Sequence, residues 1–353
     1  MSRYFIVLLG LFSTLLMCCN AEAESFSDYV SNLPYVNKKV LTDGVAHIKT
    51  SYAGNVVDIL LVNKRFNEKL VVEPVLANYQ LKGLKSIHQF HRLAGDYIGM
   101  VNGTYFNLKT GLPIGLLMVN EEVLTGSVYD RSALVIYDDK YVIERVGMNI
   151  KVNDVQVDNI NQSRMSKYHV ILYNKRWGRL APPVPENGVE VVVSNRKVTA
   201  RAVTAQYIPE DGYVLVGPST RLTSLKVGTT VDTDIDTLPS HKKALHIISG
   251  GPTVLRDGKV YILSMEEKMG GIGEGRYNRT GLCFTEDNSL FIILAQGKGL
   301  TLLEEATLMK NLGCKDGLNL DGGGSTSGYI SGKNLVDPSA RWLSNVLVIR
   351  EKR

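Results

Sequence analysis

The seven residues 319–325 combine a carboxylate with a flexible backbone, which is the pattern in this sequence best suited to catalysis. They read NLDGGGS and follow a short apolar run that predicts a β-strand. Consecutive glycines let the backbone approach a ligand closely, and the N–H groups from Gly322 to Ser325 can line an anion site. Asp321 is a candidate general base, nucleophile or ligand of a divalent cation such as calcium or magnesium. An ordinary tight turn is the alternative interpretation.

A second segment, residues 102–107, offers groups that suit a sugar. It reads NGTYFN, so two amides accompany two aromatic rings. Amides both donate and accept hydrogen bonds, and aromatic faces stack on sugar rings. Asn102 and Asp321 each follow a helix, a glycine and a short strand. This shared order predicts that the two strands lie side by side and that both side chains open onto one cleft. A turn with core aromatic residues is the alternative.

Two arginines and a glycine pair are further candidates. Arg279 stands at the entrance of a predicted strand, in the run GRYNRTG, where a guanidinium can bind a phosphate through two hydrogen bonds. A solvated surface arginine is the alternative. Gly250 and Gly251 end another predicted strand, and Arg341 precedes the final one.

Several chemistries are excluded by motif and charge. The six histidines show no His-Glu-x-x-His zinc spacing, and the chain has no P-loop, dinucleotide fingerprint or Gly-x-Ser-x-Gly elbow. The net charge of +5 comes from interspersed residues without a basic block, which argues against a nucleic-acid partner.

The first residues have the pattern of a signal peptide. Arg3 is followed by an apolar run from Tyr4 to Met17, which is too short to span a bilayer comfortably, and by a small-x-small pattern that ends at Ala23. Cleavage after Ala23 predicts an exported protein, periplasmic or secreted, without a membrane span. Lipidation at Cys18 or Cys19 is the alternative, and would anchor the protein to the cell envelope.

Export would leave two cysteines in the mature chain, Cys283 and Cys314. Both stand in apolar surroundings, and we interpret them as buried free thiols, with a disulfide as the alternative.

The mature chain reads mostly as β-strands, with two main helices. Helices are predicted over residues 85–94 and 301–312, the second with a Thr-x-x-Glu capping box. The strand predictions are residues 56–62, 70–76, 134–137, 141–143, 189–193, 213–216 and 290–294. We expect an α+β fold: a single large domain with a mixed β-sheet, few helices and long loops. Residues 24–90 would form its N-terminal strands and residues 91–353 its core, with the proline-rich residues 181–185 as a surface connection.

Taken in order, these segments resemble the phosphodiester glycosidase family. That family includes the enzyme that uncovers mannose 6-phosphate by removing N-acetylglucosamine, and bacterial exported proteins linked to exopolysaccharides. The resemblance covers roughly residues 90–350. The matching residues are Asn102-Gly103-Thr104-Tyr105-Phe106, Gly115, Gly250-Gly251-Pro252, Arg279-Thr280-Gly281, residues 319–325, Arg341 and Ser344-Asn345.

The resemblance implies hydrolysis of a sugar-1-phosphodiester at the anomeric C–O bond, in a cell-envelope or exopolysaccharide-type glycan. It assigns Asp321, Arg279 and Asn102 to catalysis, with Asp321 as the catalytic carboxylate or a cation ligand and Arg279 on the phosphate. The implied substrate-binding residues are Gly103, Tyr105, Asn107, Gly250, Gly251, Thr280, Gly322, Gly323, Gly324, Ser325 and Arg341.

One departure from the family pattern bears on activity. Asn107 stands where relatives often carry an aspartate. This favours the alternative of an envelope protein that binds a glycan or phosphate-linked polymer without turnover. A structural envelope lipoprotein is a third interpretation.

Overall fold

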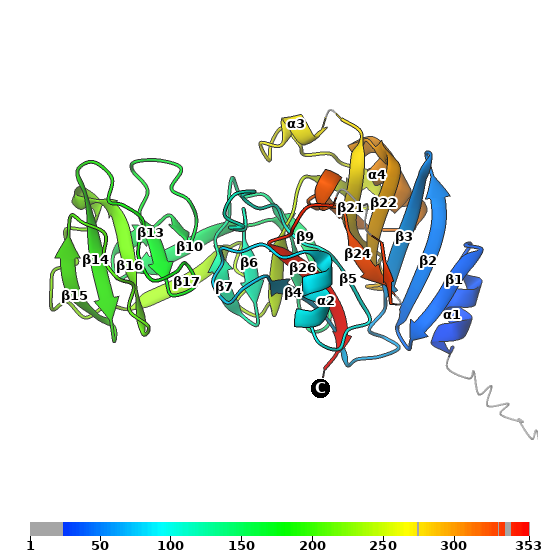
Figure 1. Ribbon diagram of the computed structural model, residues 1–353, viewed down its shortest axis with the longest axis horizontal. Helices are drawn as coiled ribbons and strands as arrows, with labels where there is room; N and C mark the ends of the chain where they lie inside the picture. Colours follow the sequence, from blue (N-terminus) through cyan, green and yellow to red (C-terminus); the bar gives the residue numbers. More distant parts are fainter. Residues whose placement is uncertain (1–23, 274, 331, 336–339, 353) are drawn as a thin grey trace, which may run out of the picture.

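The computed structural model describes residues 24–273, 275–330, 332–335 and 340–352 (Figure 1). The signal-peptide interpretation of residues 1–23, including lipidation at Cys18 or Cys19, lies outside these ranges. Within them the chain is mostly β-structure, with five sheets and four short α-helices. Few helices were expected and are found, but the prediction of one large mixed sheet is wrong. The strands divide among several sheets, and β12–β13 is the single parallel pair among the described pairings.

An eight-stranded antiparallel sheet forms the centre of the structure, in the order β1-β2-β3-β22-β21-β23-β19-β20. Helices α1 and α4 pack on one face through a cluster that includes Phe26, Ile59 and Met309. The helices are α1 (Phe26–Asn32) and α4 (Leu302–Asn311). The strands are β1 (Asn37–Thr42), β2 (Val45–Tyr52), β3 (Asn55–Val62), β19 (Thr253–Arg256), β20 (Lys259–Val260), β21 (Tyr277–Phe284), β22 (Leu290–Leu300) and β23 (Asp316–Asn319).

Two five-stranded sheets cover the opposite face. One hydrophobic core joins all three sheets, with Leu60 and Leu318 from the first, Leu347 from the second and Ile248 from the third. The second, here called the β5 sheet, has the order β25 (Lys333–Asn334), β24 (Gly328–Ile330), β5 (Gly99–Asn102), β26 (Asn345–Glu351), β4 (Leu70–Leu76). The third, the β18 sheet, has the order β7 (Glu122–Thr125), β6 (Leu117–Val119), β18 (His246–Ser249), β8 (Ser132–Ile136), β9 (Tyr141–Arg145).

Residues 147–238 form a separate lobe at one end of the molecule's long axis, drawn in green in Figure 1. The proline-rich residues 181–185 run between two of its strands and belong to neither. The lobe has a three-stranded sheet of β11 (Val155–Val157), β10 (Gly147–Val152) and β17 (Thr233–Leu238). Its five-stranded sheet has the order β12 (Asn159–Ile160), β13 (Ile171–Asn174), β16 (Gly212–Pro218), β14 (Gly188–Ser194), β15 (Lys197–Ala202).

Local sequence signals set the helix boundaries. The Thr301 hydroxyl accepts from the Glu304 N–H and the Glu304 carboxylate accepts from the Thr301 N–H, so the expected capping box opens α4. Helix α2 (Ile87–Leu93) begins with a second capping box, between Ser86 and Gln89. The remaining short elements are α3 (Gly270–Gly273) and the 3₁₀ turns η1 (Ser219–Arg221) and η2 (Gly323–Ser325). No helix in the described ranges is long and apolar enough to cross a membrane.

Two predictions about tertiary pairing are corrected. The strands that precede Asn102 and Asp321 are not neighbours, because β5 pairs with β24 and β26 whereas β23 pairs with β19 and β21. The interpretation of Cys283 and Cys314 as free thiols is also wrong. They form a disulfide that ties β21 to the segment after α4, because the helix returns the chain beside the strand it covers.

Candidate active site

The glycine-rich loop leaves β23 and turns at once into η2. Its conformation explains two of the three glycines. Gly323 adopts a φ of +59°, in the left-handed region that favours glycine. At Gly322 a side chain would meet the Asn278 carbonyl oxygen at 2.7 Å, so the loop lies directly against the start of β21. The loop is therefore a tightly packed part of the fold.

Asp321 lies at the start of this loop, where its carboxylate is largely removed from water. Its Oδ1 accepts a hydrogen bond of 3.0 Å from the Gly322 N–H. Burial raises the pKa of Asp321 to about 6, although the nearby Ser325 hydroxyl, Arg341 and the Gly322 N–H oppose the rise. A carboxyl group poised near neutral pH is what general acid–base or nucleophilic chemistry needs.

Asn102 reaches the same loop, but as an anchor. Its Nδ2 donates to the backbone carbonyl of Asp321 at 2.7 Å, and its Oδ1 accepts from the Thr280 hydroxyl at 2.7 Å and the Ser327 N–H at 3.2 Å. All three contacts are to protein, and the side chain is buried. Asn102 thus contacts the Asp321 backbone through a side chain that crosses between sheets, but it does not open onto the pocket as expected. This geometry gives Asn102 and Thr280 a positioning role.

Asn319 is a buried hub that the sequence interpretation named only as part of the motif. Its Nδ2 donates to the Tyr105 hydroxyl, the Gly251 carbonyl and the Leu320 carbonyl, each at 2.8 Å. The Tyr105 hydroxyl also lies 2.9 Å and 3.0 Å from the same two carbonyls. Because these groups come from three separate segments, Asn319 fixes the strand end against Tyr105 and the glycine pair. The Tyr105 ring, and not its hydroxyl, is left to contact a ligand.

Arg279 is buried, with only 2% of its surface exposed, so the surface-arginine alternative is wrong. Its Nε donates to the Leu300 carbonyl at 3.0 Å and its Nη2 to the Gly275 carbonyl at 3.1 Å. Its Nη1 donates to Asn319 Oδ1 at 3.3 Å. The guanidinium thus joins two backbone carbonyls and the Asn319 side chain around the loop. The phosphate contact predicted for Arg279 stays a prediction.

Arg341 approaches the loop from the other side and is exposed. Its N–H donates to the Gly324 carbonyl at 2.9 Å, and its guanidinium lies across Gly324, where an added side chain would come within 3.0 Å of Nη2. Its positive charge lowers the pKa of Asp321. Arg341 is therefore the cation at this site that can exchange solvent for a ligand.

These groups surround a pocket of about 360 Å³, a size suited to a small molecule or one end of a larger one. Six predicted site residues line it: Tyr105, Arg279, Asp321, Gly322, Gly323 and Arg341. Its other walls are Phe106, Leu108, Gly271 and Tyr277, which the sequence interpretation did not assign. Phe106 stands beside Tyr105 in the NGTYFN segment, and Tyr277 belongs to the GRYNRTG run. Aromatic character within these motifs was the signal that pointed to them.

Other predicted residues support the pocket from behind or lie outside it. A side chain at Gly103 would meet Asn345 Oδ1 at 1.9 Å, so glycine there permits close packing of β5 on β26. Gly250 and Gly251 pack on the end of β23, and Ser325 is buried within the loop, near Asp321. Asn107 is exposed, and its Oδ1 accepts from the N–H groups of Lys109 and Thr110, at 3.0 Å and 3.1 Å. Its amide therefore closes a local turn.

The site around Asp321 offers few ligands for a divalent cation. Within the described ranges, no three His, Cys, Asp or Glu side chains gather around a common point. Asp321 faces a guanidinium and a backbone N–H instead of further oxygen ligands. The residues present at this site fit an anion better than a cation.

Residues 187–350 match the family model for phosphodiester glycosidases. Over this segment the chain is similar to the phosphodiester glycosidase family. The matched segment includes the glycine-rich loop, Arg279 and Arg341, so the resemblance predicted from these motifs is confirmed where the model applies.

Solved structures share the fold beyond the matched segment. A hypothetical protein from Synechocystis superimposes with a TM-score of 0.81 at 22% identity, over 90% of this chain and 64% of that one. A Burkholderia pseudomallei protein described as exported has a TM-score of 0.69 at 20% identity, over 84% of this chain and 74% of that one. This chain thus spans less than two thirds of the Synechocystis protein.

The catalytic domain of zebrafish N-acetylglucosamine-1-phosphodiester alpha-N-acetylglucosaminidase, auto-inhibited by its pro-peptide, aligns over 91% of this chain and 85% of that one. Its TM-score is 0.47 and its identity with this chain is 14%. No curated protein matches the sequence.

Proposed function

We propose that this phosphodiester glycosidase-family protein hydrolyses a sugar-1-phosphodiester at the anomeric C–O bond, with Asp321 as its catalytic carboxylate. The observation that carries the proposal is the placement of Asp321. It is the one carboxylate among the described residues lining the pocket, and its pKa is raised to about 6 by burial. Above that pH it is an anion held in a poorly hydrated site, which makes it a competent base or nucleophile.

Arg341 takes the phosphate role that the sequence suggested for Arg279. An exposed guanidinium at the mouth of the pocket can bind phosphate oxygens through two parallel hydrogen bonds. In the loop the Gly322 N–H donates to Asp321 and the Ser325 N–H to the Gly322 carbonyl, so the N–H groups of Gly323 and Gly324 are the proposed phosphate donors. Arg279, already bonded to protein carbonyls, holds the surrounding segments in place.

The reaction follows from this charge arrangement. The bond between the anomeric carbon and the phosphate oxygen breaks, and its electron pair leaves with the phosphomonoester. Arg341 stabilises the charge that develops there, so no strong general acid is required. The oxygen of water ends on the anomeric carbon. Asp321 takes the proton from that water as a base, or forms and then releases a glycosyl intermediate as a nucleophile.

The sugar would lie against the aromatic wall. The rings of Tyr105, Phe106 and Tyr277 line the pocket next to Asp321 and offer flat apolar surface to a pyranose. The substrate class within the proposal is a cell-envelope or exopolysaccharide-type glycan. The Cys283–Cys314 disulfide supports an exported location, because disulfides persist in oxidising compartments. Asn107 was the residue that favoured a non-catalytic binder, but its side-chain oxygen accepts hydrogen bonds within its own turn.

The test is hydrolysis of a synthetic N-acetylglucosamine-1-phosphodiester in ¹⁸O-labelled water by the purified chain. We expect the label in the released sugar and none in the phosphomonoester. Asp321→Asn should abolish turnover, whereas Asp43→Asn, an exposed carboxylate in a distant hairpin turn, should retain it. Label in the phosphate, or full turnover by Asp321→Asn, would refute the proposal.

A further inference from the structure

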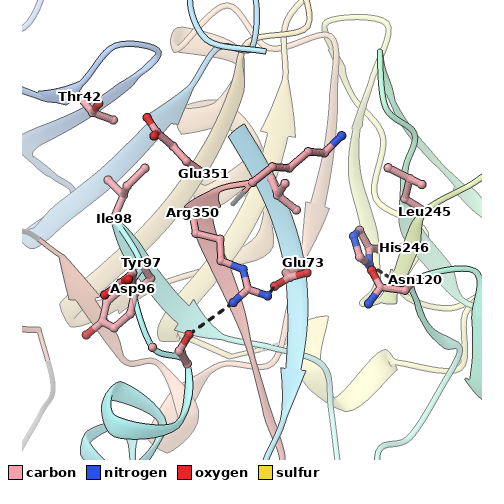
Figure 2. Close-up of a pocket in the computed structure, with 14 residues that line it drawn as sticks. Thr42, Glu73, Asp96, Tyr97, Ile98, Asn120, Leu245, His246, Arg350 and Glu351 are labelled. Carbon is pink, nitrogen blue, oxygen red and sulfur yellow. Dashed lines mark hydrogen bonds and ion pairs between the residues drawn. The ribbon is translucent and has the colours of Figure 1, made fainter. Parts of the chain in front are cut away.

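We propose that the groove across β4 and β26 is a second binding site, for a neutral oligosaccharide. Figure 2 shows this groove, which has a volume of about 1040 Å³. Its floor comes from the β5 sheet, one wall from the segment after α2, and the other from the β6–β7 turn and the start of β18. It is well above the size of the Asp321 pocket and at the upper end of ordinary ligand sites.

The floor of the groove holds a buried charge pair. Glu73 on β4 has only 5% of its surface exposed, and its carboxylate pairs with the guanidinium of Arg350 on the neighbouring strand β26. Arg350 also donates to the Ala94 carbonyl at 3.4 Å, which joins the floor to the wall after α2. The pair presents a fixed donor and a fixed acceptor at the centre of the groove, because both side chains are held by neighbours.

His246 adds an oriented donor from the opposite wall. It is 2% exposed, and its Nδ1 accepts the backbone N–H of Asn120 at 3.2 Å. Because Nδ1 is the acceptor, Nε2 carries the proton of the neutral ring. Burial lowers the pKa of His246 to about 4, and the charges of Arg350 and Lys64 act in the same direction. Figure 2 shows His246 and Asn120 to one side of β4 and Tyr97 and Asp96 to the other.

The balance of these groups identifies the class of ligand. The acidic lining residues Glu73, Asp96 and Glu351 stand beside the basic residues Arg350 and Lys352, so neither sign of charge dominates. A site for a phosphate or other anion would gather positive charge without so many carboxylates. Sugar hydroxyls both donate and accept, which suits interspersed carboxylates, a guanidinium, an imidazole and an amide. Tyr97 adds an aromatic face on one wall.

The groove and the Asp321 pocket lie toward opposite ends of the same strand. Asn345 at the start of β26 accepts the Thr104 N–H at 3.0 Å, near the segment that supports Asp321. Arg350 is five residues further along, which corresponds to roughly 17 Å in an extended strand. The two sites are therefore separate, and glycan binding in the groove does not depend on the proposed hydrolysis.

The probe is an array of neutral tetra- to hexasaccharides of hexose and N-acetylhexosamine units, with uronate and sulfated oligosaccharides of equal length as comparators. We expect the full chain to retain neutral members, and Asp321→Asn to bind them equally well. The double variant Asp96→Ala/Lys352→Ala, which changes exposed side chains, should weaken binding at least tenfold in calorimetry. Lys310→Ala, an exposed lysine at the end of α4, is the matched control. His246→Ala should weaken binding further if its melting curve shows a folded protein.

Three outcomes would overturn the proposal. If no neutral oligosaccharide binds, the groove is not a glycan site. If only the acidic oligosaccharides bind, the assigned ligand class is wrong. Binding lost in Asp321→Asn but kept in Asp96→Ala/Lys352→Ala would place the glycan in the other pocket. The result for hydrolysis stands apart, because the array measures binding without turnover.

Discussion

Glu305 on α4 is a carboxyl group buried beneath the candidate active site. It is 1% exposed, and neither of its oxygens has a hydrogen-bond partner within the described structure. It packs against β21 at Gly281, where an added side chain would come within 2.5 Å of Oε1. Burial raises the pKa of Glu305 to about 8, and the positive charge of Arg279 only partly opposes the rise.

The magnitude of its effect on stability follows from proton linkage. Between the ordinary pKa of 4.5 and the folded pKa of about 8, Glu305 is protonated in the folded protein and ionised in the unfolded chain. The folded state then binds one more proton, so the free energy of unfolding falls by about 1.4 kcal/mol for each pH unit. The contribution of Glu305 to the free energy of unfolding is fully present below the pKa that this group has in the unfolded chain. It is lost as the pH rises through the pKa in the folded protein, and the total loss is roughly 5 kcal/mol.

The perturbation is Glu305→Gln, which keeps the shape of the side chain but cannot ionise. Urea unfolding of both proteins with the disulfide intact, at intervals from about pH 5 to pH 8, gives the two free energies of unfolding. We expect the free energy of unfolding of the variant, relative to that of the wild type, to rise by about 1.4 kcal/mol for each pH unit. The comparison between the two proteins cancels every other titrating group.

Glu304→Gln is the matched control at the neighbouring position. The pKa of Glu304 is lowered, chiefly by the hydrogen bond from the Thr301 N–H, so the group is ionised in both states across this range. Its variant should lose some stability with the capping box, by an amount that does not change with pH. Parallel pH profiles for the wild type and Glu305→Gln would show that Glu305 is ionised or hydrated in the folded protein, and would refute the reasoning.

Four further predictions test the site. The rate kcat/KM should rise with pH through about 6 as Asp321 ionises, and a profile that falls through that pH would make Asp321 a general acid. Arg341→Ala should weaken phosphodiester binding about tenfold to a hundredfold with little change for the free sugar, and Arg341→Lys should recover part of it; equal losses for both ligands would contradict a phosphate contact. Asn319→Ala should lower the free energy of unfolding by about 3 kcal/mol in urea titration, because it leaves several buried partners unpaired, and a loss below about 1 kcal/mol would deny it the role of hub. In the double variant Cys283→Ser/Cys314→Ser, the free energy of unfolding under non-reducing conditions should fall by about 4 kcal/mol, as expected for a sequence separation of 31 residues. An unchanged free energy of unfolding would show that the disulfide adds no constraint.

Much of the local structure was predictable from residues close together in the chain. Apolar runs predicted β3, β4, β14, β16 and β22, and the Thr301 capping box predicted the start of α4. These signals work because strand and helix periodicity, and the hydrogen bonds of a helix end, involve residues a few positions apart. The glycine-rich loop was recognisable for the same reason, since its close backbone approach requires glycine locally.

Tertiary structure alone decided which segments meet. Nothing near Asn102 shows that β5 pairs with β24 and β26 rather than β23, because partner choice depends on burial against residues more than 200 positions away. Nor does an arginine's sequence context show its exposure: folding buried Arg279 among carbonyls and left Arg341 at the pocket mouth. The disulfide, the Asn319 hub and the buried Glu305 likewise arise from packing α4 on the central sheet. Sequence therefore identified the candidate catalytic loop, and long-range packing placed the charged side chains that surround it.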